Sequence, residues 1–410
     1  MLRQSTIETI KTITPAVAAN AETITRRFYE LMFAGNPEVK QYFNEAHQHS
    51  GGQQKALAGA ICAYFSQIDD LESLTPAVEI IAQKHCSLGI EPEHYPIVGK
   101  HLLSAIKEVM GDAATEPVLG AVAEAYGVLA DVCINREKAI YSEQLSQPGG
   151  WNGYRPFVVA KKVPESRVVT SFYLKPGDDR PLPAFQPGQY VTVRMNGLKT
   201  SPRNYSLSDS PGKDYFRISV KREPGVGPDD PVGMVSNYLH DQVNEGDRLE
   251  VGPPCGEFTL RSPLEEKKAV VFLSGGIGVT PLIAMAKHLV REMPEAPVYF
   301  FQASRNSEAH AFSEEVAQLG RESKQFQSLV MFDKPLPGDL ESGKCDGVGT
   351  LSEELLREWL PSADAQIYFC GPAPFMKSAY RMLGKIGVPR ENLHFEFFGP
   401  RQEIESSIHG

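Results

Sequence analysis

Apolar residues recur every three or four positions through about the first 146 residues, which is the pattern of helices that bury one face. The clearest series are Ile97, Val98, Leu102, Leu103, Ile106, Val109 and Met110, followed by Val118, Val122, Tyr126, Leu129 and Cys133. Prolines fall between the periodic segments, where a helix can end without losing an internal hydrogen bond. The pattern predicts about six to eight helices and no strand.

A turn-rich segment, QPGGWNG at residues 147–153, ends the helical period. Beyond it, short runs of β-branched and aromatic residues are separated by Pro, Gly and Asp. These runs lie at 168–174, 190–194 and 216–220. Short strands with such turns predict an antiparallel barrel.

From about Lys267 the pattern changes to an apolar strand, a glycine turn and a helix. Further apolar strands at 298–301 and 367–370 indicate a mainly parallel sheet with crossover helices. The predicted fold class is therefore multi-domain. It comprises an all-α domain at 1–146, a linker at 147–153, an antiparallel β-barrel domain at 154–264 and an α/β, mainly parallel-sheet domain at 265–410.

The amino-acid composition and net charge argue against several classes of function. A chain with 41% hydrophobic and 22% charged residues is globular, and 410 residues exceed one ordinary core. The net charge of −10 argues against nucleic acid or an anionic membrane as a partner. No apolar run approaches the ~20 residues that span a bilayer. The polar N-terminus does not read as a signal peptide.

The six cysteines form no C-x-x-C pair, which fits a reducing cytoplasm and argues against a cysteine-ligated zinc or iron–sulfur site of standard spacing. We therefore expect a cytoplasmic protein without a transmembrane segment.

His85 lies in the stretch IIAQKHCSLG at 80–89, on a predicted helix with apolar neighbouring turns. A histidine there can coordinate a buried group, although a lone histidine on an apolar face is more often part of the core. Glu137 falls on the buried stripe of a later helix, where a carboxylate is costly unless it is paired. Taken by itself, Glu137 can also be a surface charge near Arg136 and Lys138.

A glycine-rich turn, Gly275-Gly276-Ile277-Gly278-Val279-Thr280-Pro281, follows an apolar strand and precedes a helix. Glycines permit a tight turn and close approach to phosphate, and Pro281 suits a first helical position. The turn is not the G-x-G-x-x-G fingerprint. It therefore predicts a dinucleotide site of the reductase type.

Phe28-Tyr29, Tyr42-Phe43, Gln53 with Leu57, His85, Tyr95 and Glu137 occur in an order and at intervals that resemble the haem pocket of bacterial flavohaemoglobins. The resemblance covers nearly the whole chain. It implies a haem b whose iron is bound by His85. It also implies that Tyr95 and Glu137 make this ligand electron-rich, which favours oxygen activation over carriage.

On the other face of the haem, the resemblance assigns Tyr29 and Gln53 as polar groups beside bound oxygen, with Leu57 and Phe43 as apolar walls. Gln53 and Leu57 are four residues apart and share a helix face. As isolated residues, Tyr29 fits a core position and Gln53 a solvated face. Lys84 would lie near both haem and flavin, and it fits a solvated helix charge equally well.

The resemblance implies three flavin-binding motifs. Arg203-Asn204-Tyr205-Ser206 matches the R-x-Y-S motif that holds FAD, with Tyr205 along the flavin ring and Arg203 on phosphate. Tyr190 ends the motif PGQY. Gly233, Val235 and Ser236 belong to GMVS, a small-residue loop that suits a pyrophosphate. The segment 225–231 looks like an extended loop.

For the nicotinamide, the resemblance adds two segments to the turn at 275–280. Cys370, Gly371 and Pro372 follow a strand, at the carboxyl edge where ligands gather in open α/β sheets. Cys370 can equally be a small buried hydrophobic residue. Glu396, Phe397, Phe398, Gly399 and Pro400 resemble the terminal segment in which the aromatic ring corresponding to Phe398 covers the flavin.

The resemblance implies a nitric oxide dioxygenase that converts NO and O2 to nitrate, with electrons from NADH, or NADPH, through FAD to haem. A monomer is expected, and lipid can occupy the distal haem pocket. In Ser304-Arg305-Asn306, the cationic Arg305 is placed where it could meet the 2'-phosphate that distinguishes NADPH from NADH. Two alternatives stay open: a reductase for another acceptor, and an oxygen or redox sensor.

Overall fold

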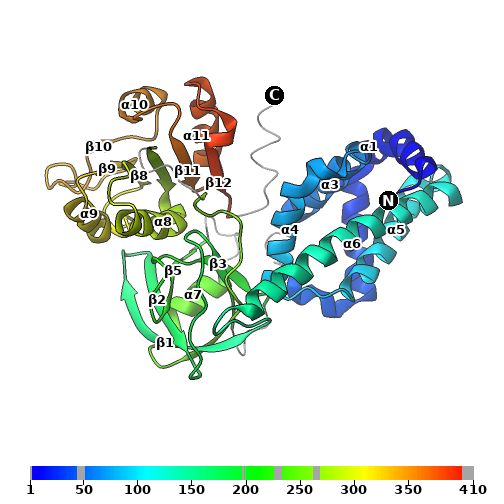
Figure 1. Cartoon of the computed structure of the whole chain (residues 1–410), viewed down its shortest axis with the longest axis horizontal. Helices are drawn as coiled ribbons and strands as arrows, with labels where there is room; N and C mark the ends of the chain where they lie inside the picture. Colours follow the sequence, from blue (N-terminus) through cyan, green and yellow to red (C-terminus); the bar gives the residue numbers. More distant parts are fainter. Residues whose placement is uncertain are drawn as a thin grey trace. The chain divides into compact units, whose positions relative to one another are not determined.

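The computed structural model describes residues 2–43, 51–195, 198, 200–225, 233–261 and 268–398. They form two compact units, the first consisting mainly of residues 1–153 and the second mainly of 154–399 (Figure 1). Gly399, Pro400, the tail that follows and residues 226–231 of the predicted loop lie outside the described residues.

The described part of the first unit is helical throughout, as its apolar period predicts. Helices α1, α3, α4, α5 and α6 carry the fold, and α1 packs against α3, α5 and α6 while α4 packs against α6. Their bounds are α1 Gln4–Gly35, η1 Pro37–Tyr42, α3 Gly52–Ser66, η2 Leu71–Leu74, α4 Thr75–Leu88, α5 His94–Met110, η3 Gly111–Ala113 and α6 Glu116–Ser146.

Pro15 lies inside α1, so the expectation that prolines fall only between helices is wrong at this position. Proline lacks the N–H that would bond to the carbonyl one turn earlier, which weakens the helix locally. Ile13 and Val17 on either side of it are buried in the core. Packing of this apolar face keeps the helix continuous, because tertiary burial outweighs local propensity.

Helix α6 is long and apolar enough to cross a membrane, judged by length and composition alone. The sequence pattern had indicated no such run. Its buried positions include Val122, Ala125, Cys133 and Ile140, and it packs against α1, α4 and α5. This is the position of a core helix.

The second unit begins with an antiparallel sheet in the order β4-β3-β6-β1-β2-β5. An isolated bridge between Leu207, just after β4, and Ile218 on β5 links the two edges. Helix α7 belongs to the same region. The bounds are β1 Arg155–Pro164, β2 Val169–Pro176, β3 Tyr190–Arg194, β4 Arg203–Ser206, β5 Phe216–Lys221, α7 Met234–Asp241 and β6 Arg248–Val251.

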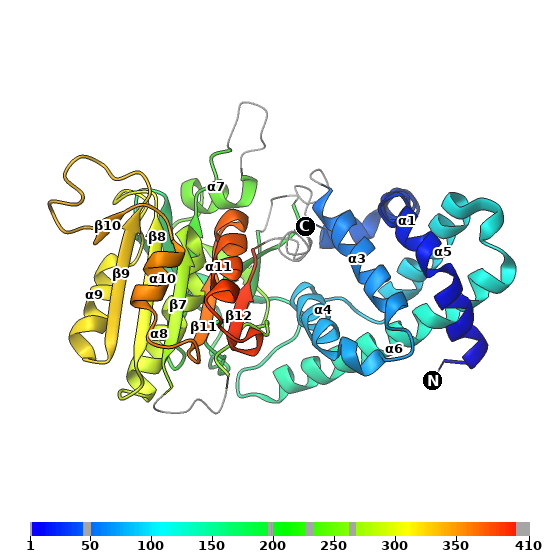
Figure 2. The ribbon, with the colours of Figure 1, turned by 90° about the horizontal axis from the view of Figure 1, so that it is seen from above.

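A parallel sheet follows, in the order β10-β9-β8-β7-β11-β12, and the strand labels run in this order across Figure 2. The predicted parallel arrangement is confirmed. The bounds are β7 Val270–Gly275, η4 Gly276–Gly278, α8 Val279–Glu292, β8 Val298–Ser304, α9 Ser313–Glu322, β9 Phe326–Phe332, β10 Gly347–Val348, α10 Glu353–Trp359, β11 Gln366–Cys370, α11 Ala373–Lys385, η5 Arg390–Asn392 and β12 Leu393–Glu396.

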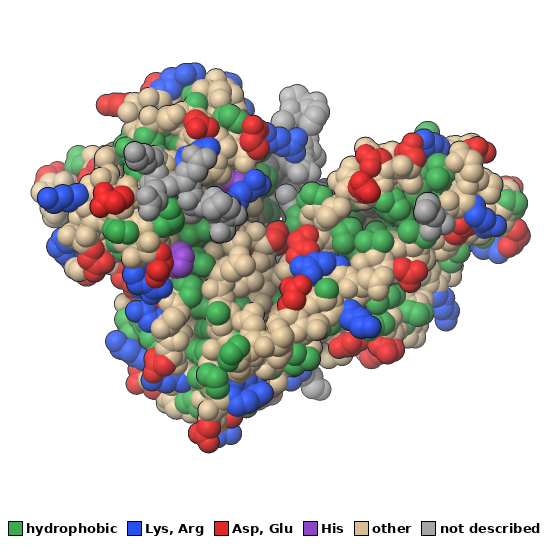
Figure 3. All heavy atoms as spheres, in the orientation of Figure 1, with side chains coloured by type: hydrophobic (Ala, Val, Ile, Leu, Met, Phe, Trp, Pro, Cys, Tyr) green, Lys and Arg blue, Asp and Glu red, His purple; other side chains and the backbone are tan. Residues whose placement is uncertain are grey.

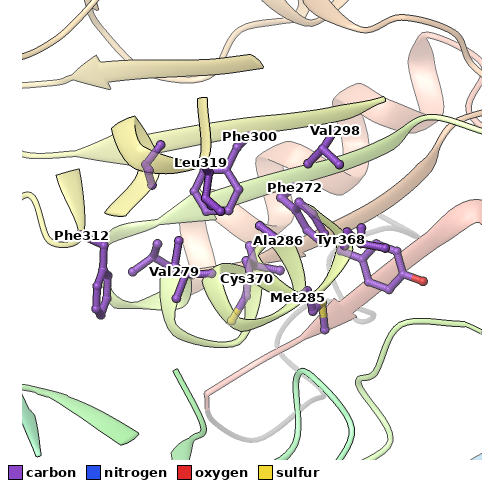
Figure 4. Close-up of a cluster of buried hydrophobic side chains, with 14 of the residues drawn as sticks. Phe272, Val279, Met285, Ala286, Val298, Phe300, Phe312, Leu319, Tyr368 and Cys370 are labelled. Carbon is purple, nitrogen blue, oxygen red and sulfur yellow. The ribbon is translucent and has the colours of Figure 1, made fainter. Parts of the chain in front are cut away.

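The central strands of this sheet are buried on both faces, which explains their continuous apolar sequence. One core joins the sheet to α8 and α9, with Phe272, Met285 and Phe300 among its members (Figure 4). A second core joins it to α10 and α11. The carboxyl ends of β7 and β11 therefore sit on a rigid three-layer frame.

A buried histidine, His310, and a half-buried one, His394, should make the second unit acid-sensitive. His310 and His394 lie 3.1 and 2.7 Å from the side-chain oxygens of Gln302 and Gln366, and burial lowers the pKa of each imidazole from 6.5 to about 4. Between about pH 4 and pH 6.5, the unfolded chain therefore binds more protons than the folded protein does. Stability should be complete above about pH 6.5, fall as pH drops, and level off below about 4.

The free energy of unfolding should fall by about 3 kcal/mol per histidine over this pH range. Melting temperatures of the second unit between pH 7 and 4 measure it, with the double variant His310→Asn, His394→Asn as comparison. A variant whose melting temperature falls as steeply as that of the parent protein would rule out these two residues as the cause.

Candidate functional site

His85 lies on helix α4, one turn before the helix ends. Gly89 stops the helix with φ of +75°, a left-handed conformation that L side chains rarely adopt. The N–H of Ile90 donates to the carbonyl of His85 at 3.0 Å. This turn leads into α5 and brings Tyr95, in its first turn, back toward His85.

His85, Tyr95 and Glu137 meet in the first unit. The His85 Nδ1 lies 2.7 Å from the Glu137 Oε1, and the Tyr95 hydroxyl donates to the same oxygen at 2.6 Å. Glu137 is 2% exposed, as its place on the buried stripe of α6 predicts. Its neighbour Arg136 instead pairs with Glu79 at 2.6 Å. Glu137 is therefore a buried acceptor and not a surface charge.

This geometry fixes the imidazole. In a neutral imidazole, a carboxylate that accepts at Nδ1 places the ring proton there and leaves the lone pair on Nε2. The described residues provide no hydrogen bond to Nε2 of His85. A neutral imidazole with one engaged and one open nitrogen is the donor that haem iron requires, so the residues present fit a haem.

Two further tyrosines, which the sequence analysis missed, hold this arrangement. The Tyr126 hydroxyl donates to the carbonyl of Tyr95 at 2.7 Å, and the Tyr141 hydroxyl donates to the carbonyl of Ile90 at 2.8 Å. Both lie on α6, and Tyr141 follows Glu137 by four residues. That helical spacing was the signal that could have identified Tyr141.

The predicted distal residues gather around an aromatic cluster. The Tyr29 ring lies 5.6 Å from those of Phe33 and Phe43, and Tyr29 is 6% exposed. Burial raises the pKa of its hydroxyl, and within the described residues this hydroxyl has no hydrogen bond. A buried phenol without a partner fits a pocket in which a polar ligand completes its bonding. Phe33 was not predicted.

Leu57 and Ile61 on α3 pack against the same core. Gln53 lies in the first turn of α3 and is half-buried. Lys84 is exposed on α4. His94 is half-buried: its Nδ1 accepts from the N–H of Glu91 at 2.9 Å, and its ring lies 4.9 Å from that of Tyr42. It thus helps to begin α5.

In the second unit, β3 and β4 bring the predicted flavin motifs together. Tyr190 pairs with Ser206, and Val193 pairs with Arg203. Gly188 has φ of +103°, and a side chain there would meet the carbonyl oxygen of Phe258 at 2.1 Å. Only glycine fits this position, which explains the motif PGQY. The Thr192 hydroxyl donates to the Asn204 side chain at 3.1 Å.

Gly233 is the N-cap residue directly before α7, with Val235 buried and the Ser236 hydroxyl donating to the carbonyl of Gly233 at 3.0 Å. The first backbone N–H groups of a helix attract anions, which suits the predicted pyrophosphate. At the opposite end of α7, the Lys162 ammonium donates to the carbonyls of His240 and Val243 at 2.6 and 2.7 Å. The sequence analysis missed Lys162 because a lysine on a strand usually faces solvent.

The two predicted nicotinamide segments lie against each other. A Cβ on Gly278 would stand 2.2 Å from the carbonyl oxygen of Cys370, and one on Gly371 would stand 3.0 Å from the Cα of Gly275. Glycine is therefore required at both loops. They lie at the carboxyl ends of β7 and β11, where open α/β sheets bind ligands. Pro281 occupies the third position of α8, and not the first as expected.

Cys370 is fully buried, and burial raises the pKa of its thiol well above the usual value, with a further contribution from Glu396. Glu396 is its register partner on β12. Phe397 packs against the second core, whereas Phe398 is 46% exposed. The described residues thus end on an aromatic side chain that is accessible at the edge of the sheet.

Comparison with known protein families gives three matches along the chain. Residues 26–133 match the globin family, 156–260 an oxidoreductase FAD-binding domain, and 272–381 an oxidoreductase NAD-binding domain. A globin domain holds haem, and the other two hold FAD and a nicotinamide dinucleotide. These are the cofactors of the chain.

Two solved structures are similar. A flavohemoglobin from Malassezia yamatoensis with bound FAD and heme has a TM-score of 0.83 and 26% identity, covering 97% of this chain and 100% of its own. The FAD/NAD-binding domain of nitric oxide dioxygenase from Vibrio cholerae O1 has a TM-score of 0.53 and 32% identity, covering 60% of this chain and 99% of its own.

Whole-chain relatives carry one name. The flavohemoprotein of Rhodopirellula baltica is 60% identical over 98% of this chain and 99% of its own length. That of Bacillus subtilis is 42% identical over the full length of both chains. Identity at this level along all three domains makes the chain a member of the flavohemoprotein family.

Proposed function

We propose that this protein is a nitric oxide dioxygenase, which converts NO and O2 to nitrate with electrons from NADH. The observation that carries the proposal is the buried carboxylate of Glu137 on the Nδ1 of His85. A proximal ligand with anionic character favours oxygen activation over oxygen storage. Tyr95, whose hydroxyl pKa is raised by burial and then by Glu137, holds that carboxylate in place.

The reaction needs one electron for each NO and O2 converted to nitrate, whereas NADH gives two at once. When bound, FAD supplies the conversion from hydride to single electrons, and haem supplies the iron. Arg203 and Tyr205 would bind FAD, with Gly233 and Ser236 at its pyrophosphate. The turn at 275–280 would bind the dinucleotide, and Phe398 would cover the flavin ring.

In the distal pocket, the Tyr29 hydroxyl would donate a hydrogen bond to dioxygen, with Gln53 as a second polar group. Leu57 and Phe43 would exclude water from this site. We further propose a monomeric, cytoplasmic protein, with room for lipid in the distal pocket. On the face seen in Figure 3, acidic and basic side chains are interspersed over each unit, which favours small molecules over nucleic acid as partners.

Consumption of NADH under air, with and without NO, tests the proposal. We expect NO to accelerate NADH oxidation strongly, with nitrate formed at two molecules for each NADH. The Vibrio cholerae relative, named as a nitric oxide dioxygenase, supports this expectation. Fast NADH oxidation that is independent of NO, with an added electron acceptor, would instead indicate a reductase for another partner.

We expect a higher kcat/KM for NADH than for NADPH. Arg305 is exposed at the carboxyl end of β8 and could meet a 2'-phosphate. Two acidic residues lie nearby: Glu308, which pairs with Arg167 at 2.8 Å, and Asp333, whose N–H donates to the carbonyl of Ser304. They disfavour an added phosphate. Steady-state kinetics with both nicotinamides checks this, and a clear preference for NADPH would overturn it.

A further inference from the structure

A cluster of charged side chains links the barrel to the nicotinamide domain, with Arg217 and Asp209 buried and Lys287 and Glu315 partly exposed. Arg217 on β5 is buried, and its guanidinium makes a two-pronged ion pair with Glu315 on α9. Its Nε also donates to the Ser208 hydroxyl at 3.1 Å. A strand of the barrel is thus tied to a helix of the other domain.

Lys287 on α8 completes the cluster. Its ammonium lies 2.5 Å from a carboxylate oxygen of Asp209 and 2.9 Å from one of Glu315. Asp209 belongs to the barrel and also accepts from the Tyr215 hydroxyl at 2.8 Å. We call Asp209, Arg217, Lys287 and Glu315 the interdomain ion cluster. Glu165 borders it, and burial raises the pKa of that carboxyl.

The backbone at the start of α9 is strained next to this cluster. Phe312 has φ of +64°, and it is the one residue other than glycine with positive φ in the described part of the chain. The Arg217 guanidinium lies 5.1 Å from the centre of its ring. A non-glycine residue stays in this conformation only where its surroundings over-determine it. The contact with Arg217 therefore has a fixed geometry.

Helix α8 connects the cluster to both cofactor motifs. It begins directly after Gly278 of the nicotinamide turn. Its Met285 packs so close to Gly188 of the flavin motif that a Cβ there would stand 2.4 Å from the methionine methyl group. Lys287, two residues further along, holds the helix to Asp209. A shift of α8 against the barrel would move the nicotinamide turn relative to the flavin motif.

We propose that the interdomain ion cluster sets the position of the nicotinamide domain over the flavin, with Lys287 and Arg217 as positioning residues for hydride transfer. Buried ion pairs add little net stability because desolvation offsets their attraction, whereas their geometry is specific. Hydride transfer from C4 of NADH to N5 of the flavin, which oxidises NADH to NAD⁺ and reduces FAD, needs reacting atoms about 3–3.5 Å apart.

The test uses the whole protein with FAD bound and the variant Lys287→Met. Stopped-flow flavin reduction at saturating NADH should slow at least fivefold, while the dissociation constant for FAD stays unchanged. Hydrogen exchange should rise in α8, α9 and residues 207–215. Lys287→Arg, which keeps the charge, should restore the rate. Since flavin reduction needs no NO, the result is independent of the proposed dioxygenase activity.

Glu314→Gln is the matched control, because Glu314 lies on α9 beside Glu315 but pairs with Arg321 at the surface. It should leave the rate unchanged. Glu315→Gln provides a second variant if Lys287→Met loses FAD. The positioning role would be overturned if the variant that keeps FAD reduces its flavin at the same limiting rate as the parent protein. A lower melting temperature of that variant would not change this conclusion.

Discussion

Replacing His85 with alanine should abolish native haem ligation and NO-dependent NADH oxidation, while flavin reduction by NADH stays intact. The Nδ1 of His85 is held by Glu137, and its Nε2 has no hydrogen bond in the described residues, so removing this imidazole removes the nitrogen that is open to the iron. The flavin motifs belong to the other compact unit. The Soret spectrum, the flavin spectrum and NADH-driven reduction of an artificial acceptor measure the three effects.

Added imidazole should partly restore the Soret band of this variant, because the cavity left by the side chain lies beside the Glu137 carboxylate. His94→Ala is the matched control: His94 is also half-buried in the first unit, but it bonds to the backbone of Glu91. This control should keep haem. A folded His85→Ala protein with a native Soret band would remove His85 as the ligand. Loss of flavin reduction as well would contradict the modular arrangement.

Local patterns were enough to predict the architecture. The strands at β7, β8 and β11 were recognisable because strands buried on both faces are apolar throughout. In contrast, β1 and β4 were among the strands that were missed, together with β6, β9, β10 and β12. The second half of β1 faces solvent at most positions, and β4 is only four residues long, so neither shows a clear alternation. The boundaries proposed for the domains remain predictions.

The proximal group was predicted from the family resemblance. The apolar stripe around Glu137 supports a paired carboxylate but leaves a surface charge open as an alternative. The interdomain ion cluster could not be predicted. Arg217 sits in an alternating strand and Lys287 on an amphipathic helix, where each fits a solvated position. Their contacts join residues 78 and 98 positions apart, Lys287 with Asp209 and Arg217 with Glu315. Hydrophobic periodicity carries no information about which charged groups meet across an interface.

Tyr29→Phe should raise the dissociation rate of dioxygen roughly ten- to hundredfold and slow NO conversion, without changing flavin reduction. The substitution removes one hydroxyl that would donate to partly anionic dioxygen, a bond worth on the order of 1.5–3 kcal/mol. The ring contacts with Phe28, Phe33 and Phe43 are retained by phenylalanine. Stopped-flow or flash-photolysis measurements of the oxygen off-rate give the effect directly.

Tyr64→Phe makes the same chemical change in the same core and serves as the control. The Tyr64 hydroxyl donates to the carbonyl of Ala125 at 2.7 Å, so its loss removes a buried hydrogen bond between α3 and α6. That variant should lose stability and keep its oxygen off-rate, whereas Tyr29→Phe should show the reverse, because no described protein group loses a partner. An unchanged off-rate in Tyr29→Phe would make Tyr29 a packing residue and transfer the distal role to Gln53 or to water.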